Sequence, residues 1–120
     1  MRKPQTTNPE LLQLIRTLKK KSREKDAKIW LDIADFLAKS RSQHVAVNLS
    51  KINRYTKESD VIVVPGKILG AGIIDHTVTV AAFSASGKAQ EKLTGAKAKY
   101  ITIKELLKQN PTGSNVKIIR

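Results

Sequence analysis

Residues 61–83, VIVVPGKILGAGIIDHTVTVAAF, are the stretch of sequence that decides the fold. Two runs rich in β-branched residues, Val61–Val64 and Thr77–Phe83, flank a segment that holds three glycines. Short β-branched runs bounded by turn residues are typical of buried strands. We expect Pro65 and Gly66 to end the first run. The stretch therefore predicts two strands of a buried sheet.

The rest of the second half alternates between strands of this kind and short helices. Ser86 can cap a helix that Gly95 ends, and Thr102 and Glu105 have the spacing of a capping box for another helix. Short strands alternating with helices favour an α/β layer with largely parallel pairing. The further predicted strands are Val45–Leu49, Tyr100–Thr102 and Val116–Ile119, and the predicted helices reach Leu93 and Lys108.

The first half predicts a helical hairpin. Asn8 is placed to cap the first helix, with Pro9 in its first position. Ser22 or Asp26 is expected to cap the second helix, which should end near Lys39. The apolar positions with helical spacing are Leu11, Leu12, Ile15 and Leu18, then Ile29, Trp30, Ile33, Ala34, Phe36 and Leu37. We expect a basic helical hairpin over residues 1–44 and an α/β body over residues 45–120.

The charge of the chain is its most informative global property. The 120 residues include 23 Lys and Arg against 10 Asp and Glu, which gives a net charge of +13. A compact body this basic repels itself unless a polyanion neutralises it, so nucleic acid or an anionic membrane surface is the first class of partner to consider. The excess is densest between residues 19 and 28, which include Lys19, Lys20, Lys21, Arg23, Lys25 and Lys28.

A second segment, SKINRYT at residues 50–56, combines Lys51 and Arg54 with Tyr55. Arginine can donate two hydrogen bonds to one phosphate, and tyrosine can stack on an unpaired base, so this combination favours RNA over a membrane. Membrane attachment would need bulky apolar residues free to insert, whereas those of the hairpin are better used in joining its helices. Because the chain has only five aromatic residues, we expect phosphate and shape contacts with little reading of base sequence.

The sequence contains few side chains that could carry out catalysis or bind a metal ion. Cys is absent, which excludes disulfides, thiolate metal sites and a cysteine nucleophile. His44 and His76 are the acid–base candidates near neutral pH, and we expect His76 to lie partly buried on the face of Val78 and Val80, with Asp75 on the opposite face. No apolar run approaches the roughly 20 residues of a membrane span, and the N-terminus does not resemble a signal peptide. We expect a cytoplasmic protein that is not an enzyme and binds no cofactor or metal.

The glycine-containing stretch Val64–Gly72 does not fit a phosphate loop. Gly66-Lys67 is followed by isoleucine instead of Ser or Thr, and Gly70 with Gly72 lacks the third glycine of a dinucleotide site. We therefore expect turns in which these glycines supply positive φ or a close approach of the backbone. An interpretation in which the backbone amides and Lys67 contact an RNA phosphate stays open.

Longer strings of sequence point to one family. Residues 47–93, VNLSKINRYTKESDVIVVPGKILGAGIIDHTVTVAAFSASGKAQEKL, closely resemble ribosomal protein L-eighteen-e of the archaeal and eukaryotic large ribosomal subunit. The N-terminal TNPELLQLIRTLKKKSREKDAKIWLDIADFL and the C-terminal KQNPTGSNVKIIR are similar to the same family, so the resemblance covers nearly the whole chain. Residues 78–95 are more loosely similar to the bacterial L-fifteen ribosomal family.

The resemblance implies a structural protein of the large ribosomal subunit that binds ribosomal RNA and abuts neighbouring ribosomal proteins, without a membrane or small-molecule partner. It also implies an irregular strand-strand-helix superhelix in the C-terminal part, and the lack of a long basic C-terminal extension favours an archaeal source. A free-standing RNA-binding protein or RNA chaperone is the alternative, because it would share the charge. Together with the charge pattern, the resemblance gives as candidate RNA contacts Arg16, Lys19, Lys20, Lys21, Arg23, Lys51, Arg54, Tyr55 and Lys67.

Overall fold

A parallel sheet forms the centre of the computed structural model, which describes residues 9–38 and 45–120. Its strands are β1 (Val45–Asn48), β2 (Asp60–Leu69), β3 (Val78–Ala85), β4 (Lys99–Thr102) and β5 (Val116–Ile118). The order is β1-β2-β3-β4, and β5 pairs with β2 on the edge that β1 also uses. Because β5 lies along the first half of β2 and β1 along its second half, β2 joins the whole sheet together.

The length of β2 corrects the prediction that Pro65 and Gly66 end it. The strand continues through both residues, and its register with β3 shifts between Val64 and Lys67. A β-bulge of this kind tolerates proline, because a residue without an N–H does little harm where the ladder is already interrupted. Beyond the bulge, Gly66 pairs with Val45, so the extra length of β2 is what gives β1 its partner.

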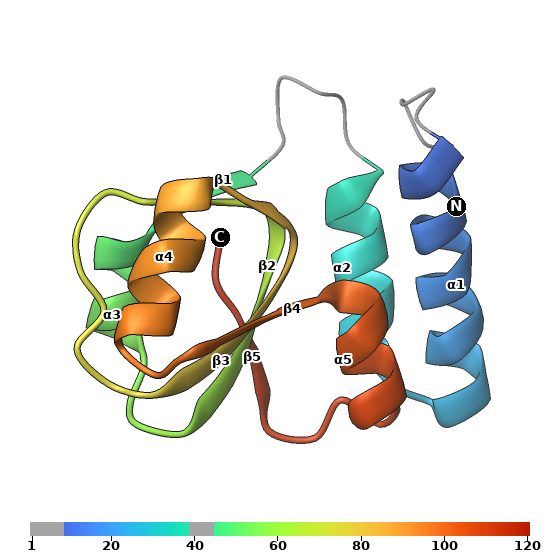
Figure 1. The fold of residues 1–120 in the computed structure, drawn as a ribbon. Helices are drawn as coiled ribbons and strands as arrows, with labels where there is room; N and C mark the ends of the chain where they lie inside the picture. Colours follow the sequence, from blue (N-terminus) through green and yellow to red (C-terminus); the bar gives the residue numbers. More distant parts are fainter. Residues whose placement is uncertain (1–8, 39–44) are drawn as a thin grey trace.

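Helices cover both faces of the sheet, which makes three layers (Figure 1). In the described residues they are α1 (Pro9–Lys25), α2 (Lys28–Leu37), α3 (Leu49–Tyr55), α4 (Gly87–Gly95) and α5 (Ile103–Gln109). Val63 and Ala81 point to the face covered by α1, α2 and α5, whereas Ile62 and Val80 point to the face covered by α3 and α4. The predicted α/β class, with largely parallel pairing and an N-terminal helical hairpin, is confirmed.

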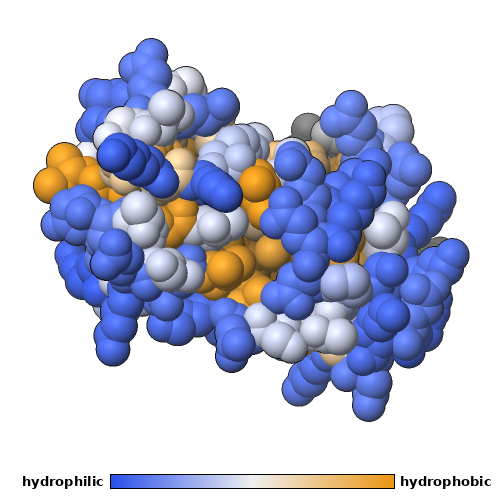
Figure 2. All heavy atoms as spheres, turned by 60° about the horizontal axis from the view of Figure 1, so that its bottom comes forward, coloured by the Kyte–Doolittle hydropathy of each residue, from blue (hydrophilic) through white to orange (hydrophobic). Residues whose placement is uncertain are grey.

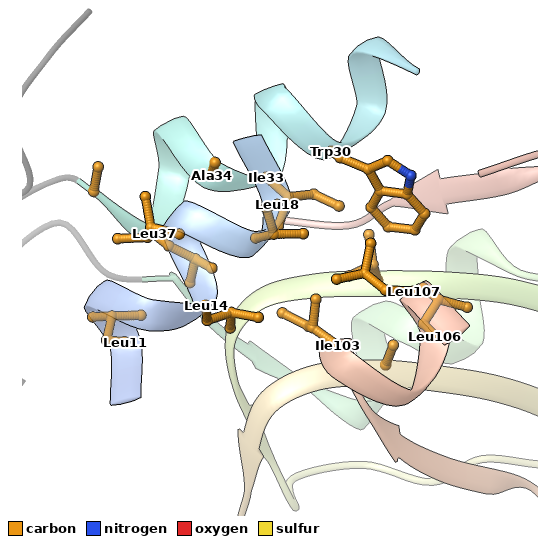
Figure 3. Close-up of a cluster of buried hydrophobic side chains, with 14 of the residues drawn as sticks. Leu11, Leu14, Leu18, Trp30, Ile33, Ala34, Leu37, Ile103, Leu106 and Leu107 are labelled. Carbon is orange, nitrogen blue, oxygen red and sulfur yellow. The ribbon is translucent and has the colours of Figure 1, made fainter. Parts of the chain in front are cut away.

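The hairpin of α1 and α2 packs on the sheet together with α5 (Figure 3). Trp30 is fully buried there, and its indole Nε1 donates a hydrogen bond of 2.8 Å to the carbonyl oxygen of Pro111. The hairpin therefore shares a core with the sheet, and the outer side of α1 is fixed relative to the rest of the molecule. The division of the chain at residue 44 stays a prediction, and that residue lies outside the described part of the chain.

The turn between α1 and α2 corrects the prediction that Ser22 or Asp26 caps the second helix. Asp26 has a left-handed φ of 49°, and the N–H of Ala27 bonds to the carbonyl oxygen of Ser22 at 3.0 Å. This is a Schellman motif: it ends α1, and Ala27 becomes the N-cap residue of α2 without a side-chain cap. The predicted cap at Asn8 and the predicted end near Lys39 lie outside the described residues.

Helix α3 is an element that the sequence analysis did not predict. The chain passes directly from β1 into α3 at Asn48, so Leu49, which was expected to end the strand, begins the helix. Leu49 and Ile52 are fully buried in the core between the sheet and α4. Their burial orients the polar residues of this short helix outward.

The caps of α4 and α5 are those that the sequence predicts. The Ser86 hydroxyl accepts a hydrogen bond from the N–H of Ala89 at 3.1 Å. Thr102 and Glu105 form the complete capping box at the start of α5. The order β2, β3, α4 is also the strand-strand-helix succession that the family resemblance implies.

Candidate nucleic-acid interface

The candidate RNA contacts lie in three separate places. Helix α1 carries Arg16, Lys19, Lys20, Lys21 and Arg23, helix α3 carries Lys51, Arg54 and Tyr55, and β2 carries Lys67. α1 and α3 lie on opposite sides of the sheet (Figure 1). The structure therefore presents two basic faces instead of one continuous patch.

Four of the cations on α1 form a stripe, which we call the α1 stripe. Arg16, Lys19, Lys20 and Arg23 follow the i, i+3, i+4, i+7 spacing that places side chains along one side of a helix. Lys19 is half-buried and the other three are exposed. Because the leucine and isoleucine side chains of α1 enter the core, the stripe is turned to solvent.

Lys21 lies on a different side of α1 from the stripe. Its Nζ donates a hydrogen bond of 3.5 Å to Oε2 of Glu24, and Lys20 Nζ lies 3.9 Å from Oε1 of the same carboxylate. Solvent-exposed pairs of this kind stabilise a protein by about 0–1 kcal/mol, so an approaching phosphate can replace the carboxylate at little cost. Arg16 and Arg23 form no ion pair with the described residues.

The polar side of α3 brings the cations of the SKINRYT segment together. The Arg54 guanidinium carbon lies 5.9 Å from the centre of the Tyr55 ring, within the range of a cation–π contact. Tyr55 is 57% exposed, which is unusual for an aromatic side chain in a small protein. Lys51 Nζ donates a hydrogen bond of 2.5 Å to the backbone oxygen of Arg120.

That last contact identifies two cations that the sequence analysis missed, Lys117 and Arg120. β5 and the residues after it run beside α3, and a shallow groove of about 410 Å³ separates them. We call it the α3–β5 groove, and it is lined by Lys51, Tyr55, Lys117, Ile118, Ile119 and Arg120. Alternation in β5 could have indicated that Lys117 points outward, but no sequence signal places this strand next to residues 51–55.

Lys117 is partly compensated by a carboxylate. Its Nζ lies 3.1 Å from Oδ2 of Asp60, which also accepts a hydrogen bond of 2.8 Å from the N–H of Lys57. The hydrogen bond from the Lys57 backbone, followed by the one from Lys117, holds the pKa of Asp60 below its usual value. Asp60 therefore stays ionised and fixes the Lys117 ammonium at the edge of the groove.

The glycines around Lys67 only partly have the positive φ or close backbone approach that the sequence predicts. Lys67 is exposed on β2. Gly70 meets the requirement for close approach, since an added Cβ would lie 2.9 Å from the side chain of Lys88, and Gly72 meets the requirement for positive φ, at +90°. Gly66 does not meet the expectation of positive φ, because it lies inside the strand.

The backbone of this glycine segment is already engaged in internal hydrogen bonds. Lys92 Nζ donates to the carbonyl oxygens of Gly70 at 2.8 Å and Gly72 at 2.7 Å. The N–H of Ala71 donates to Oδ1 of Asn48 at 3.2 Å. An anion would therefore have to displace Asn48 to reach the Ala71 amide, and the contact of this segment with an RNA phosphate stays a prediction.

Thr56, His76 and Asp75 form a hydrogen-bonded chain, which corrects the prediction that Asp75 lies on the opposite face from His76. His76 Nδ1 lies 2.9 Å from Asp75 Oδ1, and His76 Nε2 lies 2.7 Å from Thr56 Oγ1. Strand alternation does not govern these residues, because β3 begins only at Val78. The hydrogen bond with His76 is the main reason that the pKa of Asp75 is lowered. The expectation of a partly buried, hydrogen-bonded imidazole is confirmed.

The hydroxyl of this chain is not placed for nucleophilic attack. Thr56 is only 8% exposed, and its hydroxyl donates to the carbonyl oxygen of Ile52 at 2.7 Å. The three side chains instead connect the C-terminal end of α3 to the segment before β3. His44, the other acid–base candidate, lies outside the described residues.

The described residues contain neither a membrane-spanning helix nor a cluster of metal ligands. No helix in the described ranges is long and apolar enough to cross a bilayer. Among residues 9–38 and 45–120, no three His, Asp or Glu side chains gather as metal ligands. On the face shown in Figure 2, hydrophobic residues are exposed near the middle and at the left edge, and most of the surrounding surface is hydrophilic.

Comparisons with known proteins connect this geometry to a family. A family model described as ribosomal protein 60S L18 and 50S L18e matches residues 1–120. The chain is 50% identical over 119 residues to the large ribosomal subunit protein eL18 of Methanospirillum hungatei, which covers 99% of this chain and 98% of the relative. It is 51% identical over 114 residues to the protein of the same name from Methanosphaerula palustris, with 95% and 94% covered. The corresponding protein of Methanococcus maripaludis is 47% identical over 119 residues, with 99% of each chain covered.

Proposed function

We propose a function from one established premise, which is that the chain belongs to the family of ribosomal proteins 60S L18 and 50S L18e. Its relatives are named as proteins of the large ribosomal subunit, and the role of this chain is accordingly a structural one in that subunit. In detail, the protein binds folded large-subunit ribosomal RNA through phosphate contacts in cytoplasmic ribosomes. It also packs against neighbouring ribosomal proteins, for which the 63% exposed Ile73 is a suitable contact.

The observation that carries this proposal is the α1 stripe. From Arg16 to Arg23 it extends about 10 Å along the helix, at 1.5 Å per residue. The stripe is therefore long enough to meet several successive phosphates of one RNA strand. The fully buried Trp30 and its bond to Pro111 hold the hairpin on the body, so the four cations reach the RNA in a fixed arrangement.

The second basic face supports a scaffolding role. α3 presents Lys51, Arg54 and Tyr55 on the side of the sheet away from α1. A single RNA helix in contact with the α1 stripe cannot also reach α3 through the three layers of the protein. Two RNA segments are therefore held on opposite sides, and their mutual repulsion is reduced by the net charge of +13.

The salt dependence of binding tests the electrostatic mechanism. Neutralising about five phosphates gives a slope of log affinity against log salt near −4, so raising salt fourfold should weaken binding to purified large-subunit RNA by about two to three decades. An affinity that stayed constant over this range would refute the mechanism. Sedimentation of cell extract provides the matching control in vivo, because a free-standing RNA chaperone would remain outside ribosomal particles.

A further inference from the structure

The α3–β5 groove combines three kinds of surface that rarely meet on a protein exterior. Tyr55 and Lys51 line it from α3, and Lys117, Ile118, Ile119 and Arg120 line it from β5 and the residues after it, which form its floor. The Ile118 side chain packs on the core of α1, α2 and α5, and the Ile119 side chain packs in the core on the α3 side. The groove is open to solvent, and its volume is about 410 Å³.

Internal contacts hold the floor of this groove in place. The N–H of Ile119 donates to the carbonyl oxygen of Val63 at 3.0 Å, and the Ile119 side chain is buried in the core under α3. Ile118 pairs with Val63 in the sheet. Lys51 joins α3 to the backbone of Arg120 across the groove, so both sides keep a constant separation.

The Tyr55 ring is prepared for stacking. Arg54 lies against the ring but does not line the groove, so the guanidinium supports the ring from outside the groove. An aromatic side chain held in this way and more than half exposed offers a flat apolar surface to a flat ligand. Nucleic-acid bases are the ligands that stack on such rings without regard to base identity.

The guanidinium of Arg120 is available to bind a phosphate. The guanidinium carbon lies 4.5 Å from the centre of the Phe36 ring of α2, so the guanidinium lies toward the α2 side of the groove, across β5 from α3. A guanidinium held over a ring can still donate from its edge. Arg120 forms no ion pair with the residues that the structure describes. Lys117 also lines the groove and is fixed by Asp60.

We propose that the α3–β5 groove binds one unpaired nucleotide of the RNA, with its base stacked on Tyr55 and its phosphate bound by Arg120 and Lys117. The proposal rests on the RNA-binding function argued above and specifies the kind of RNA structure that this face selects. A regular duplex would satisfy the cations but would leave Tyr55 and the apolar floor without a partner, because paired bases expose no free ring face. An extruded nucleotide supplies both a ring and a negative charge.

Two substitutions at one position test the stacking. With the full chain and purified large-subunit ribosomal RNA, Tyr55→Leu should weaken binding about 10-fold, whereas Tyr55→Phe, which keeps the ring, should bind within twofold of the parent. Tyr55→Phe should also keep the salt slope of the parent, whereas Tyr55→Leu, which releases the nucleotide together with its phosphate, should lower it. Equal affinities of the Leu and Phe variants would overturn the proposal.

A double-mutant cycle tests whether Tyr55 and Arg120 hold the same nucleotide. Arg120→Gln should weaken binding and reduce the salt slope by about one unit. Combined with Tyr55→Leu, its effect should be less than the product of the two single effects, because either change alone already releases the nucleotide. Lys108→Gln on α5, which removes an equal charge far from the groove, should combine multiplicatively with Tyr55→Leu. Multiplicative effects for Tyr55 and Arg120 would overturn the shared site.

The outcomes separate this proposal from the general function. If the parent protein binds RNA with a steep salt slope and Tyr55→Leu has no effect, the groove proposal fails and the phosphate-binding function stands. If the parent protein shows no salt-dependent binding, the function itself fails. If Tyr55→Leu leaves RNA affinity intact but weakens incorporation into large subunits, the occupant is a neighbouring protein and the nucleotide is excluded.

Discussion

The α1 stripe and the α3–β5 groove contain similar cations but arise in different ways. The stripe comes from one helix, and its four residues lie within eight positions of sequence. The groove joins Lys51 to Arg120, which are 69 residues apart. The stripe therefore depends on helical periodicity and on the seating of one hairpin, whereas the groove depends on the pairing of β5 with β2. A basic stripe on one helix is therefore visible as a local charge run in the sequence, whereas a surface that mixes aromatic and cationic residues from distant segments is visible only in the tertiary fold.

The largest expected effect is on the free energy of unfolding, and it comes from the packing that holds the hairpin of α1 and α2 on the sheet. Trp30→Ala removes a fully buried indole and its hydrogen bond to Pro111, and should lower the free energy of unfolding by about 3–5 kcal/mol in chemical denaturation. Trp30→Phe, which keeps an aromatic ring but loses the hydrogen bond, should cost less. A loss below about 1 kcal/mol for the alanine variant would mean that the hairpin does not depend on this core.

Removing the stripe itself should have the next largest effect. Replacing Lys19, Lys20 and Arg23 with Ala should weaken RNA binding about 100-fold and reduce the salt slope by about 2.7, while the thermal midpoint changes little. The matched control replaces three exposed lysines that belong neither to the α1 stripe nor to the α3–β5 groove, Lys97, Lys99 and Lys108. Equal losses in the two triple variants would show that net charge alone determines affinity.

A smaller effect is expected where α3 is attached to the body. Thr56→Val removes the hydroxyl that contacts both Ile52 and His76, and should cost about 1 kcal/mol of stability, with faster amide exchange in α3 than in α1. Thr94→Val, at an exposed position of α4, should change stability by less than about 0.5 kcal/mol. Uniform acceleration of exchange in both helices would contradict a local role for Thr56.

The smallest effect is a difference in acid sensitivity between the two regions. Asp60 and Asp75, which support the α3 side, have pKa values lowered by hydrogen bonds. A carboxyl whose folded-state pKa is depressed stabilises the protein above its unfolded pKa, near 3.8, and this contribution is lost as pH falls below that value. Amide exchange should therefore accelerate in α3 before α1 on acidification, and Asp60→Asn should reduce the difference. Simultaneous acceleration in both helices would argue against it.

The sequence predicts the local features of this fold well, but it predicts poorly the features that depend on packing between distant segments. Periodicity gave the hairpin, and side-chain chemistry gave the caps at Ser86 and Thr102, because both are determined by residues within one turn. Pro65 and Gly66 misled the analysis, since a bulge in a strand with partners on both edges accommodates what an isolated strand would not. α3 was missed because its two buried residues are too few to establish a helical period.

The residues of the candidate site also differ in whether local sequence or the tertiary fold places them. The spacing of the stripe cations is visible in the sequence, although only the structure separates Lys21 from them through Glu24. Lys117 and Arg120 carried no signal, because neither lies near another candidate in sequence. The Asp75–His76 contact was predicted wrongly for a related reason: the strand expected at Thr77 begins at Val78, and alternation was applied to residues in a bend.

Crosslinking within intact large ribosomal subunits that contain this protein tests the central claim most directly. Ultraviolet irradiation followed by mass spectrometry identifies which peptides are joined to RNA and which RNA segments they contact. The account predicts that peptides from α1 and from α3 are both joined to ribosomal RNA, and to separate segments of it. Subunits in which neither peptide is crosslinked to RNA, while peptides from other elements are, would contradict it.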